Sequence, residues 1–526
     1  MTQARLFVSI LIVLGSLSVT VSALAVSDSV EMISQLLTGD PNRSLKAAMA
    51  LSQFAPDSLA KWITSFREYP KPERAGQIMR ITHRLNDSCD APVLVYVPSK
   101  YDPKIATPLF VYLHGGVSRP AFPAISDSEL LEDPLLKLSE QNGWFYVFPL
   151  SRFDCVWWSP EGVDHIQWLV REMKRRFHID DSRVSIGGFS DGGSGSFHIA
   201  MTSPTDFANL FPWSGHMAVG SLDGPMQQHL PNMMNRPLYA TVGGKDQLYP
   251  TVGMLPMLQT ALKAGANLNV TVYDTATHND SYLLHEFDKI SRIVNENRRD
   301  PLRSHIYWET SDVKYGKCDW FTITALDTTK PPAEWHKTYD CMLVDDRVTV
   351  GFQADQEWKG EGVKVGSVMS DTTSAAYTAG LLKDDVIIAL DAFEVKSMRD
   401  LSKARSTKKR GDAVTLTVLR NEKKEVLHGK FPPVQEYAAF PRKAKSGAVS
   451  AIRIGNRFEI ETSGVKSIEI LLNPEMINFD QPVVIIANGI AVFDGIVKKE
   501  SKLLLDHFLQ DRDRELLWFG RVTVSL

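Results

Sequence analysis

A serine between glycines is the feature of this chain that most directly predicts chemistry. The segment Gly188-Phe189-Ser190-Asp191-Gly192 fits the pattern G-x-S-x-G. Glycines at these positions let the backbone make a sharp strand-to-helix turn that exposes the serine hydroxyl. The apolar run 183–187 predicts the strand, and the residues after Ser194 predict the helix. We therefore interpret Ser190 as a nucleophile; the alternative is a Ser/Gly-rich loop without chemistry.

A serine hydroxyl is a weak nucleophile unless a base takes its proton and an acid orients that base. Asp246 and His278 each follow a predicted strand, in the chain order Ser, acid, His that strand-turn-helix hydrolases use. Because the carboxyl ends of parallel strands meet at one edge of a sheet, we expect Ser190, Asp246 and His278 to form a catalytic triad. The alternatives are Asp223 or Asp274 as the acid and His285 as the base.

Acyl transfer also requires N–H donors for the negative oxygen of a tetrahedral intermediate. The segment His114-Gly115-Gly116 ends a predicted strand, and its glycines allow a backbone N–H to point at a substrate. We expect Gly115 and Gly116 to form the oxyanion hole with the N–H of Asp191, the residue after the nucleophile. Without the nearby serine motif, His-Gly-Gly would be interpreted as a simple turn.

Three tryptophans and a histidine are candidates for the wall of a substrate pocket. Trp157, Trp158 and Trp213 would suit an apolar or aromatic acyl group. His216 follows another predicted strand end and is a further candidate. The alternatives are core packing for the tryptophans and a hydrogen-bonded structural role for the histidine.

The region 77–297 alternates between short apolar strands and helical segments. This alternation is typical of a mainly parallel sheet with helices on both faces. The predicted strands are 78–83, 93–97, 109–113, 145–148, 184–187, 238–242 and 270–273. The clearest predicted helices are 162–177, 194–201, 253–264 and 282–296. This sheet must hold the predicted catalytic side chains at one edge.

With these motifs and elements, the region 77–297 resembles an α/β-hydrolase of the carboxylesterase type. It is similar to secreted esterases, polyhydroxybutyrate depolymerases and prolyl-oligopeptidase-like proteins in His114-Gly115-Gly116, the Ser190 turn, Asp246 and His278. The resemblance implies hydrolysis of carboxylic esters through an acyl-enzyme on Ser190, with His278 as base and then acid. A serine peptidase of the prolyl-oligopeptidase type is the alternative enzyme.

The region 346–432 resembles a PDZ domain of the circularly ordered bacterial kind. The resemblance rests on Val350-Gly351-Phe352 and on the string 379–387, although Asp384 and Asp391-Ala392 replace the family's usual glycine turns. It implies that a peptide or protein C-terminus pairs with an exposed strand edge while Gly351 and Phe352 hold its carboxylate. The alternatives are a packing module without a ligand and, for the whole chain, a non-catalytic peptide-binding adaptor.

The remaining regions carry no catalytic signature. Helical spacing predicts an N-terminal helical region over 26–76. Regions 300–345 and 447–526 both show β patterning, and they resemble two parts of a small accessory β domain into which the PDZ-like unit is inserted. A simple tandem order of domains is the alternative.

The N-terminus predicts export. A basic residue, an apolar run and Val21-Ser22-Ala23-Leu24-Ala25 describe a signal peptide over 1–25. The apolar run is shorter than the roughly 20 residues that a spanning helix needs. We therefore expect a periplasmic or secreted protein that does not span the membrane once processed.

Composition limits the possible partners and cofactors. The chain has 526 residues and a net charge of −4, so several domains are expected and nucleic-acid binding is not. The four cysteines match no zinc pattern, and we expect no metal and no cofactor. In an exported protein they allow a Cys318–Cys341 disulfide, which leaves Cys89 with Cys155; free buried thiols are the alternative.

Overall fold

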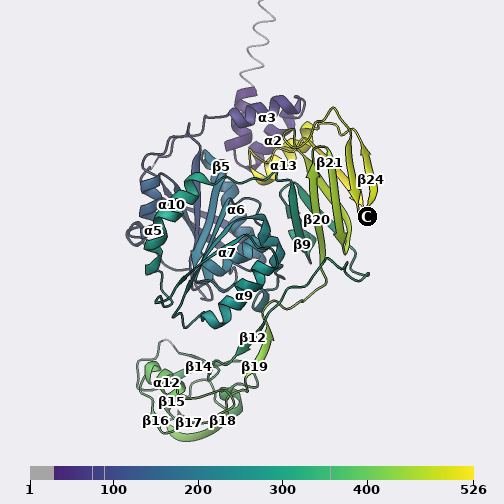
Figure 1. Cartoon of the computed structure of the whole chain (residues 1–526). Helices are drawn as coiled ribbons and strands as arrows, with labels where there is room; N and C mark the ends of the chain where they lie inside the picture. The colour runs from purple at the N-terminus through teal and green to yellow at the C-terminus, as the bar shows by residue number, and fades with distance from the viewer. Residues whose placement is uncertain (1–28, 74, 88, 356) are drawn as a thin grey trace, which may run out of the picture. The chain divides into compact units, whose positions relative to one another are not determined.

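The computed structural model describes residues 29–73, 75–87, 89–355 and 357–526 (Figure 1). The predicted signal peptide lies outside these residues. The chain divides into two compact units, Met1–Asp340 with Phe440–Leu526 and Cys341–Ala439. The smaller unit is therefore an insertion between two parts of the larger one.

An eight-stranded sheet forms the centre of the larger unit. Its spatial order is β1-β2-β4-β3-β5-β6-β7-β8. The strands are β1 (Gln77–Asn86), β2 (Cys89–Val97), β3 (Thr107–Leu113), β4 (Phe145–Pro149), β5 (Ile179–Phe189), β6 (Asn209–Trp213), β7 (Leu238–Gly243) and β8 (Leu268–Tyr273). Pairing is antiparallel from β1 to β4 and parallel from β4 to β8. This strand order and mixed direction define the α/β-hydrolase fold.

Helices cover both faces of this sheet. They are α4 (Asp127–Leu131), α5 (Pro134–Asn142), α6 (Pro160–Arg176), α7 (Asp191–Thr202), α8 (Val219–Leu222), η1 (Leu230–Asn235), α9 (Thr251–Lys263), η2 (Ser281–Glu286) and α10 (Phe287–Glu296). Helices α5 and α10 share a core cluster with Phe110 of β3. Helix α7 lies on the other face. A side chain on Gly195 of α7 would meet Leu113 of β3, and Leu113 and Phe110 point to opposite faces because side chains alternate along a strand.

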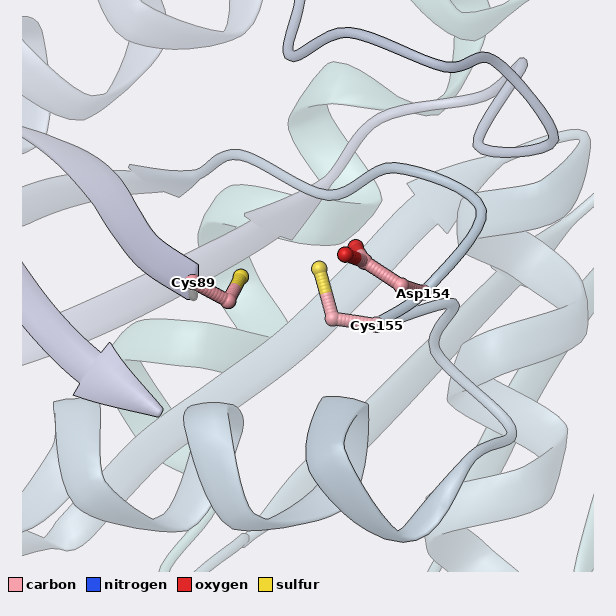
Figure 2. Close-up of side chains that lie close together, drawn as sticks. All are labelled: Cys89, Asp154 and Cys155. Carbon is pink, nitrogen blue, oxygen red and sulfur yellow. The ribbon is translucent and has the colours of Figure 1, made fainter. Parts of the chain in front are cut away.

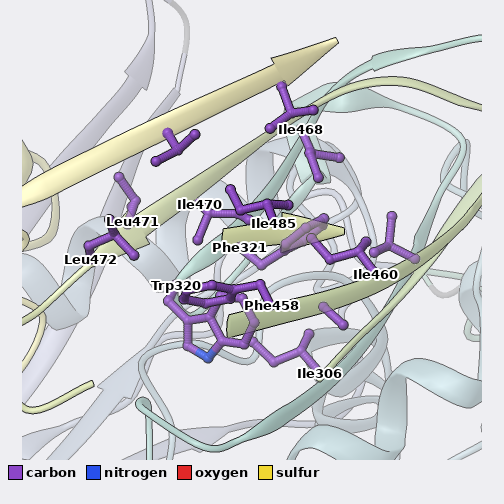
Figure 3. Close-up of a cluster of buried hydrophobic side chains, with 14 of the residues drawn as sticks. Ile306, Trp320, Phe321, Phe458, Ile460, Ile468, Ile470, Leu471, Leu472 and Ile485 are labelled. Atoms are coloured by element: carbon purple, nitrogen blue, oxygen red, sulfur yellow. The ribbon is translucent and has the colours of Figure 1, made fainter. Parts of the chain in front are cut away.

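A β-sandwich forms the second part of the larger unit (Figure 3). Its two sheets have the orders β24-β23-β21-β20-β9 and β10-β11-β22-β25. The strands are β9 (His305–Thr310), β10 (Lys317–Cys318), β11 (Phe321–Leu326), β20 (Gly447–Ile454), β21 (Arg457–Ser463), β22 (Val465–Leu472), β23 (Val483–Ala487), β24 (Ile490–Gly495) and β25 (Gly520–Ser525). β9 pairs with β20, and β11 with β22. Strands from before and after the insertion therefore complete the same two sheets.

The N-terminal helices pack against a C-terminal helix. Figure 1 shows α2 (Pro41–Leu51) and α3 (Pro56–Ser65) beside α13 (Ser501–Asp511). Leu51, Leu59 and Ile63 share a core cluster with Leu504 and Phe508. The sequence predicts only β structure over 447–526, so α13 was missed. In the described part of the chain, no helix combines the length and apolar character needed to cross a membrane.

The smaller unit is a PDZ domain. Its main sheet has the order β13-β14-β15-β17-β18, with β16 beside β15. The elements are β13 (Phe352–Ala354), β14 (Val363–Val368), α11 (Ala375–Ala379), β15 (Val386–Leu390), β16 (Phe393–Glu394), α12 (Met398–Arg405), β17 (Ala413–Arg420) and β18 (Lys423–Lys430). Asp384 and Asp391 adopt left-handed φ values of 71° and 49°. Aspartate tolerates this conformation better than most residues, so these turns form without glycine.

The PDZ unit extends beyond the predicted limits of 346–432. β12 (Met342–Asp345) pairs with β19 (Gln435–Ala438), which joins the two ends of the insertion. The predicted Cys318–Cys341 disulfide is wrong for this structure, because neither cysteine is in a disulfide bond. Cys318 is buried in β10 of the larger unit, whereas Cys341 belongs to the smaller unit.

Candidate functional site

One chain of hydrogen bonds joins the three residues predicted as a triad. His278 Nε2 lies 2.8 Å from Ser190 Oγ, and His278 Nδ1 lies 2.7 Å from Asp246 Oδ2. The three residues follow β5, β7 and β8, whose carboxyl ends meet at one edge of the parallel sheet. The arrangement can move the Ser190 proton to His278 and keep the imidazole oriented by a carboxylate.

The turn at Ser190 is strained, and its glycines are required by close packing. Ser190 has φ 60° and ψ −121°, and its N–H donates to the Trp213 carbonyl oxygen at 3.0 Å. A Cβ on Gly188 would lie 2.2 Å from the Leu113 carbonyl oxygen, and one on Gly192 would lie 1.8 Å from it. Only glycine at these two positions lets the end of β3 approach the turn so closely.

Asp246 is fixed from its own loop. Its side chain is 1 % exposed, and Oδ1 accepts the backbone N–H groups of Leu248 and Tyr249 at 2.8 and 2.9 Å. Oδ2 therefore faces His278. The imidazole contacts two aromatic rings, with centroid distances of 4.9 Å to Phe189 and 5.2 Å to Tyr249.

The predicted oxyanion turn lies against the nucleophile. A Cβ on Gly115 would lie 3.1 Å from Ser190 Cβ and 3.6 Å from Ser190 Oγ. Among the described residues, the backbone N–H groups of Gly115, Gly116 and Asp191 have no hydrogen-bond acceptor. The N–H of Val117, by contrast, donates to Asp191 Oδ2 at 3.0 Å. The three predicted donors thus remain available to a substrate oxygen.

His114 has a structural position at this turn. Its Nδ1 lies 2.8 Å from the Gly115 carbonyl oxygen, and its Nε2 accepts the Ser151 N–H at 3.0 Å. This pairing assigns the ring proton to Nδ1. Burial lowers the pKa of His114, which favours the neutral ring. The Trp157 indole N–H donates to the His114 carbonyl oxygen at 2.9 Å, which further stabilises the turn.

The candidate pocket tryptophans have packing positions. Trp157, Trp158 and Trp213 are 0 %, 4 % and 1 % exposed, and Trp213 belongs to the core between the sheet, α5 and α10. His216 lies closer to the site: its backbone N–H donates to Ser194 Oγ at 2.8 Å, and its ring centroid is 5.4 Å from that of Tyr249.

Tyr249 and Val117 were missed from the sequence. The Tyr249 hydroxyl donates to Asp191 Oδ1 at 3.2 Å, while Val117 reaches the other oxygen of the same carboxylate. Burial, and then the Asp191 charge, raise the pKa of Tyr249, so the phenol stays protonated. No motif marks either residue, and only the place of Tyr249 three residues after Asp246 hints at a role.

A separate group of polar side chains lies close together in the larger unit (Figure 2). The ligand atoms of Cys89, Asp154 and Cys155 lie within 4.8 Å of one another, with both thiols free and buried. Arg152 donates two hydrogen bonds of 2.8 Å to Asp154, so the carboxylate is already engaged. Burial raises the pKa of Cys155 to about 12. Cys89 and Cys155, which were expected as a pair, thus lie close together but form no disulfide bond.

The predicted peptide-carboxylate loop lies at the start of an edge strand. β13 begins at Phe352 and, in the part of the chain that the structure describes, pairs only with β14. Gly351 has φ +95°, and a Cβ there would lie 2.4 Å from Ser374 Cβ. The free edge of β13 can accept a further strand.

Comparisons with known proteins agree with this architecture. The PDZ domain family model matches residues 343–428. The bifunctional acetylxylan esterase/xylanase XynS20E of Neocallimastix patriciarum is 28 % identical over 130 residues, which cover 24 % of this chain and 18 % of that enzyme. The chain is thus similar to less than one fifth of its curated relative.

Solved structures of hydrolases are similar to part of the chain. Esterase 2 of Thermogutta terrifontis is 11 % identical, with a TM-score of 0.35 and coverage of 43 % of this chain and 97 % of that one. A putative dipeptidyl aminopeptidase IV of Bacteroides ovatus is 16 % identical, with a TM-score of 0.37 and coverage of 42 % and 36 %. The larger unit has a serine-hydrolase-like fold, which its own strand order already defines.

Proposed function

We propose that this chain is an exported serine hydrolase that cleaves carboxylic esters through an acyl-enzyme on Ser190. The observation that carries the proposal is the hydrogen-bond chain from Ser190 through His278 to Asp246. Such a chain activates an otherwise weak nucleophile. The ester preference is supported by the resemblance of the region 77–297 to carboxylesterases.

In the first half of the reaction, Ser190 Oγ attacks the ester carbonyl carbon and His278 Nε2 takes the hydroxyl proton. The negative oxygen then accepts hydrogen bonds from the N–H of Asp191 and from Gly115 or Gly116. Collapse of the intermediate breaks the bond to the alcohol, which leaves with the proton from His278. The acyl group stays on Ser190.

In the second half, water replaces the alcohol. His278 takes a proton from the water as its oxygen attacks the acyl carbon, and the same N–H groups hold the second oxyanion. Breaking the bond to Ser190 Oγ releases the carboxylic acid and returns the proton to the serine. Throughout, Asp246 stabilises the protonated imidazole.

A fluorophosphonate probe tests the nucleophile. The purified mature protein is treated with the probe beside Ser190→Ala, and both are assayed with short-chain aryl esters. We expect labelling and hydrolysis by the wild type and neither by the variant. An unlabelled, inactive wild type would support the non-catalytic adaptor, and labelling of Ser190→Ala would exclude Ser190 as the nucleophile. Cleavage of peptide anilides in preference to esters would favour the peptidase.

Peptide binding is a second candidate function, and it is favoured by the free edge of β13. An extended C-terminus would pair with β13 while the loop at Gly351 and Phe352 holds its carboxylate. A C-terminal peptide library tests this, with amidated copies of the same peptides as controls. Binding of the free carboxylates alone is expected, and no binding at all would leave the PDZ unit without a peptide ligand.

Export is the part of the proposal that rests on residues 1–25. Their order of basic residue, apolar run and small residues is that of a signal peptide. N-terminal sequencing of the protein recovered outside the cytoplasm should begin after Ala23 or Ala25. An uncleaved protein in the cytoplasm would contradict export while leaving the chemistry intact.

A further inference from the structure

Three loops of the proposed active site meet at the carboxylate of Asp191. Asp191 follows the nucleophile after β5, Val117 follows the oxyanion turn after β3, and Tyr249 follows the acid after β7. Val117 N–H donates to Asp191 Oδ2 at 3.0 Å, and the Tyr249 hydroxyl donates to Oδ1 at 3.2 Å. Each oxygen of one carboxylate is thus bound by a different loop.

Tyr249 connects this carboxylate to the triad by two further contacts. Its backbone N–H donates to Asp246 Oδ1 at 2.9 Å, and its ring meets the His278 ring edge-on at 5.2 Å. The Asp246 loop and the serine turn are therefore tied together by one side chain. Movement of Tyr249 would shift the acid and the nucleophile relative to each other.

The contact with Val117 fixes the direction of the oxyanion turn. It removes the Val117 N–H from the possible substrate donors and leaves those of Gly115 and Gly116. Oxyanion donors act only within a narrow range of distances from the negative oxygen, and a displacement of about 1 Å can lower a rate by about 100-fold. A fixed turn is therefore part of the chemistry.

The carboxylate has no direct catalytic task in this geometry. Its two oxygens are occupied by Val117 and Tyr249, and neither has a hydrogen bond to Ser190 or His278 among the described residues. A bare negative charge beside an oxyanion would oppose catalysis. The Val117 N–H and the Tyr249 hydroxyl partly neutralise that charge. The Asp191 carboxylate therefore serves as a hydrogen-bond acceptor that holds the two loops.

We propose that Asp191, held by the Tyr249 hydroxyl, is a positioning residue that fixes the oxyanion turn against the nucleophile. The inference rests on the proposed serine-hydrolase function. Asp191 acts on the reaction through Val117 and the adjoining turn. Tyr249 acts through Asp191, and its hydroxyl also interacts with the Ser190 and Ser194 side chains. Both affect the transition state more than the binding of substrate.

We call the contacts of Asp191 with Val117 and Tyr249 the clamp. Four variants of the full-length protein test it: Asp191→Ala, Asp191→Asn, Tyr249→Phe and the double variant Asp191→Ala/Tyr249→Phe. Asp191→Ala removes both contacts. Asp191→Asn keeps an oxygen for Val117 and turns an NH₂ group toward the Tyr249 oxygen. Tyr249→Phe removes one hydroxyl but keeps the ring and the backbone N–H. Asp280→Ala is the control, because Asp280 is an exposed carboxylate near His278 whose side chain makes no cap hydrogen bond.

The readouts are kcat and KM for an aryl ester and the affinity for a trifluoromethyl ketone, which forms an oxyanion on the serine. Asp191→Ala should lower kcat by about 10- to 100-fold, with KM changed less than about threefold. The ketone affinity should fall in parallel with kcat. Asp191→Asn should recover kcat to within about threefold of the wild type, Tyr249→Phe should lose about threefold to tenfold, and the double variant should match Asp191→Ala.

The outcomes separate the inference from the proposed function. An inactive, unlabelled wild type would remove the proposed function itself. An active wild type whose Asp191→Ala and Tyr249→Phe variants keep full kcat and ketone affinity would overturn the clamp, as would Asp191→Asn with a defect equal to Asp191→Ala. If Asp191→Ala fails to fold, Asp191→Asn and Tyr249→Phe decide together. Full kcat and ketone affinity in Tyr249→Phe would overturn the clamp, and a loss in Tyr249→Phe supports it only if that loss and the effect of Asp191→Asn combine less than additively when both substitutions are present.

Discussion

At residue 115, the nucleophile leaves almost no room for a side chain. A Cβ there would lie 3.1 Å from Ser190 Cβ and 3.2 Å from the Phe189 carbonyl oxygen. The backbone of Gly115 does not have a positive φ, so alanine is compatible with its conformation. Glycine is therefore required at position 115 because the nucleophile lies so close, and not because of the backbone conformation of the turn.

Gly115→Ala should reduce turnover without unfolding the protein. The new methyl group pushes the oxyanion turn and the serine apart by a few tenths of an ångström, and we expect kcat to fall by about tenfold or more. Aryl-ester kinetics and a thermal melt measure the two effects. Gly253→Ala is the control, since a Cβ there meets nothing within 4 Å. Unchanged kcat in Gly115→Ala would show that the turn has more freedom than the structure gives it.

At the scale of elements, α7 and β3 are joined through Gly192. A Cβ on Gly192 would overlap the backbone of Leu113, at 1.8 Å from the oxygen and 2.6 Å from the carbon. Backbone atoms of a central strand cannot move aside as a flexible side chain can. The first turn of α7 therefore requires glycine for packing as well as for the nucleophile.

Two glycine-to-alanine substitutions should move stability in opposite directions. Gly192→Ala should lower the free energy of unfolding by about 3 kcal/mol or more, because the helix must leave the strand. Gly253→Ala in α9 should raise it by up to about 1 kcal/mol, because alanine favours the helix and the space is open. Urea unfolding measures both. A Gly192→Ala protein as stable as the wild type would disprove the close approach.

His198 of α7 should make the larger unit sensitive to acid. Its side chain is 0 % exposed, and burial lowers the pKa of His198 to about 3. An unfolded histidine takes up a proton below about pH 6.5, whereas the folded one does not, so stability is full above pH 6.5 and falls with pH below it. At pH 5 the loss from this one group is about 2 kcal/mol.

Replacement of the buried histidine tests that sign. The stability that the wild type loses between pH 7.5 and pH 5 should be smaller by about 2 kcal/mol in His198→Leu. Urea unfolding at the two pH values gives the difference, which is independent of any constant effect of the substitution. His285→Gln, at an exposed histidine, is the control. Equal losses in wild type and His198→Leu would mean that the folded protein protonates His198.

At the scale of the whole molecule, the larger unit holds the chain on both sides of the insertion. The buried carboxylate of Glu309 binds His336 before the insertion and Arg442 after it, at 2.9 and 2.5 Å. Burial alone would raise the pKa of Glu309, but its contacts with His229, His336 and Arg442 hold it well below its usual range. The larger unit therefore fixes both linkers within its own core.

Removal of the PDZ unit should leave the hydrolase working. Asp340 Oδ1 accepts the Phe440 N–H at 2.7 Å, so the two ends adjoin, and a two-glycine bridge can replace residues 341–439. We expect the shortened protein to keep its fluorophosphonate labelling and thermal midpoint but to bind no C-terminal peptide. The separately expressed residues 341–439 serve as the complementary control. A folded deletion protein without labelling would mean that the PDZ unit is needed for the chemistry.

Features that depend on local backbone geometry could be predicted from the amino-acid sequence. The serine turn, the order Ser190, Asp246, His278 and the strands around them follow from glycines and apolar periodicity within short windows. Asp384 and Asp391, which replace the glycines usual in PDZ domains, also lie at the positions where left-handed turns form. For β6 the sequence predicted only a strand end before His216, without a range for the strand.

Contacts between residues that lie far apart in the chain could not be predicted from the sequence and are known from the fold alone. The clamp of Val117, Asp191 and Tyr249 joins loops after three different strands, and nothing in their local sequence distinguishes them. The same holds for α13, which forms where the N-terminal helices cover its leucines. It holds also for Cys318, which is buried in the larger unit, whereas Cys341 belongs to the smaller one. Such contacts depend on how whole elements pack, so a short window of sequence contains no record of them.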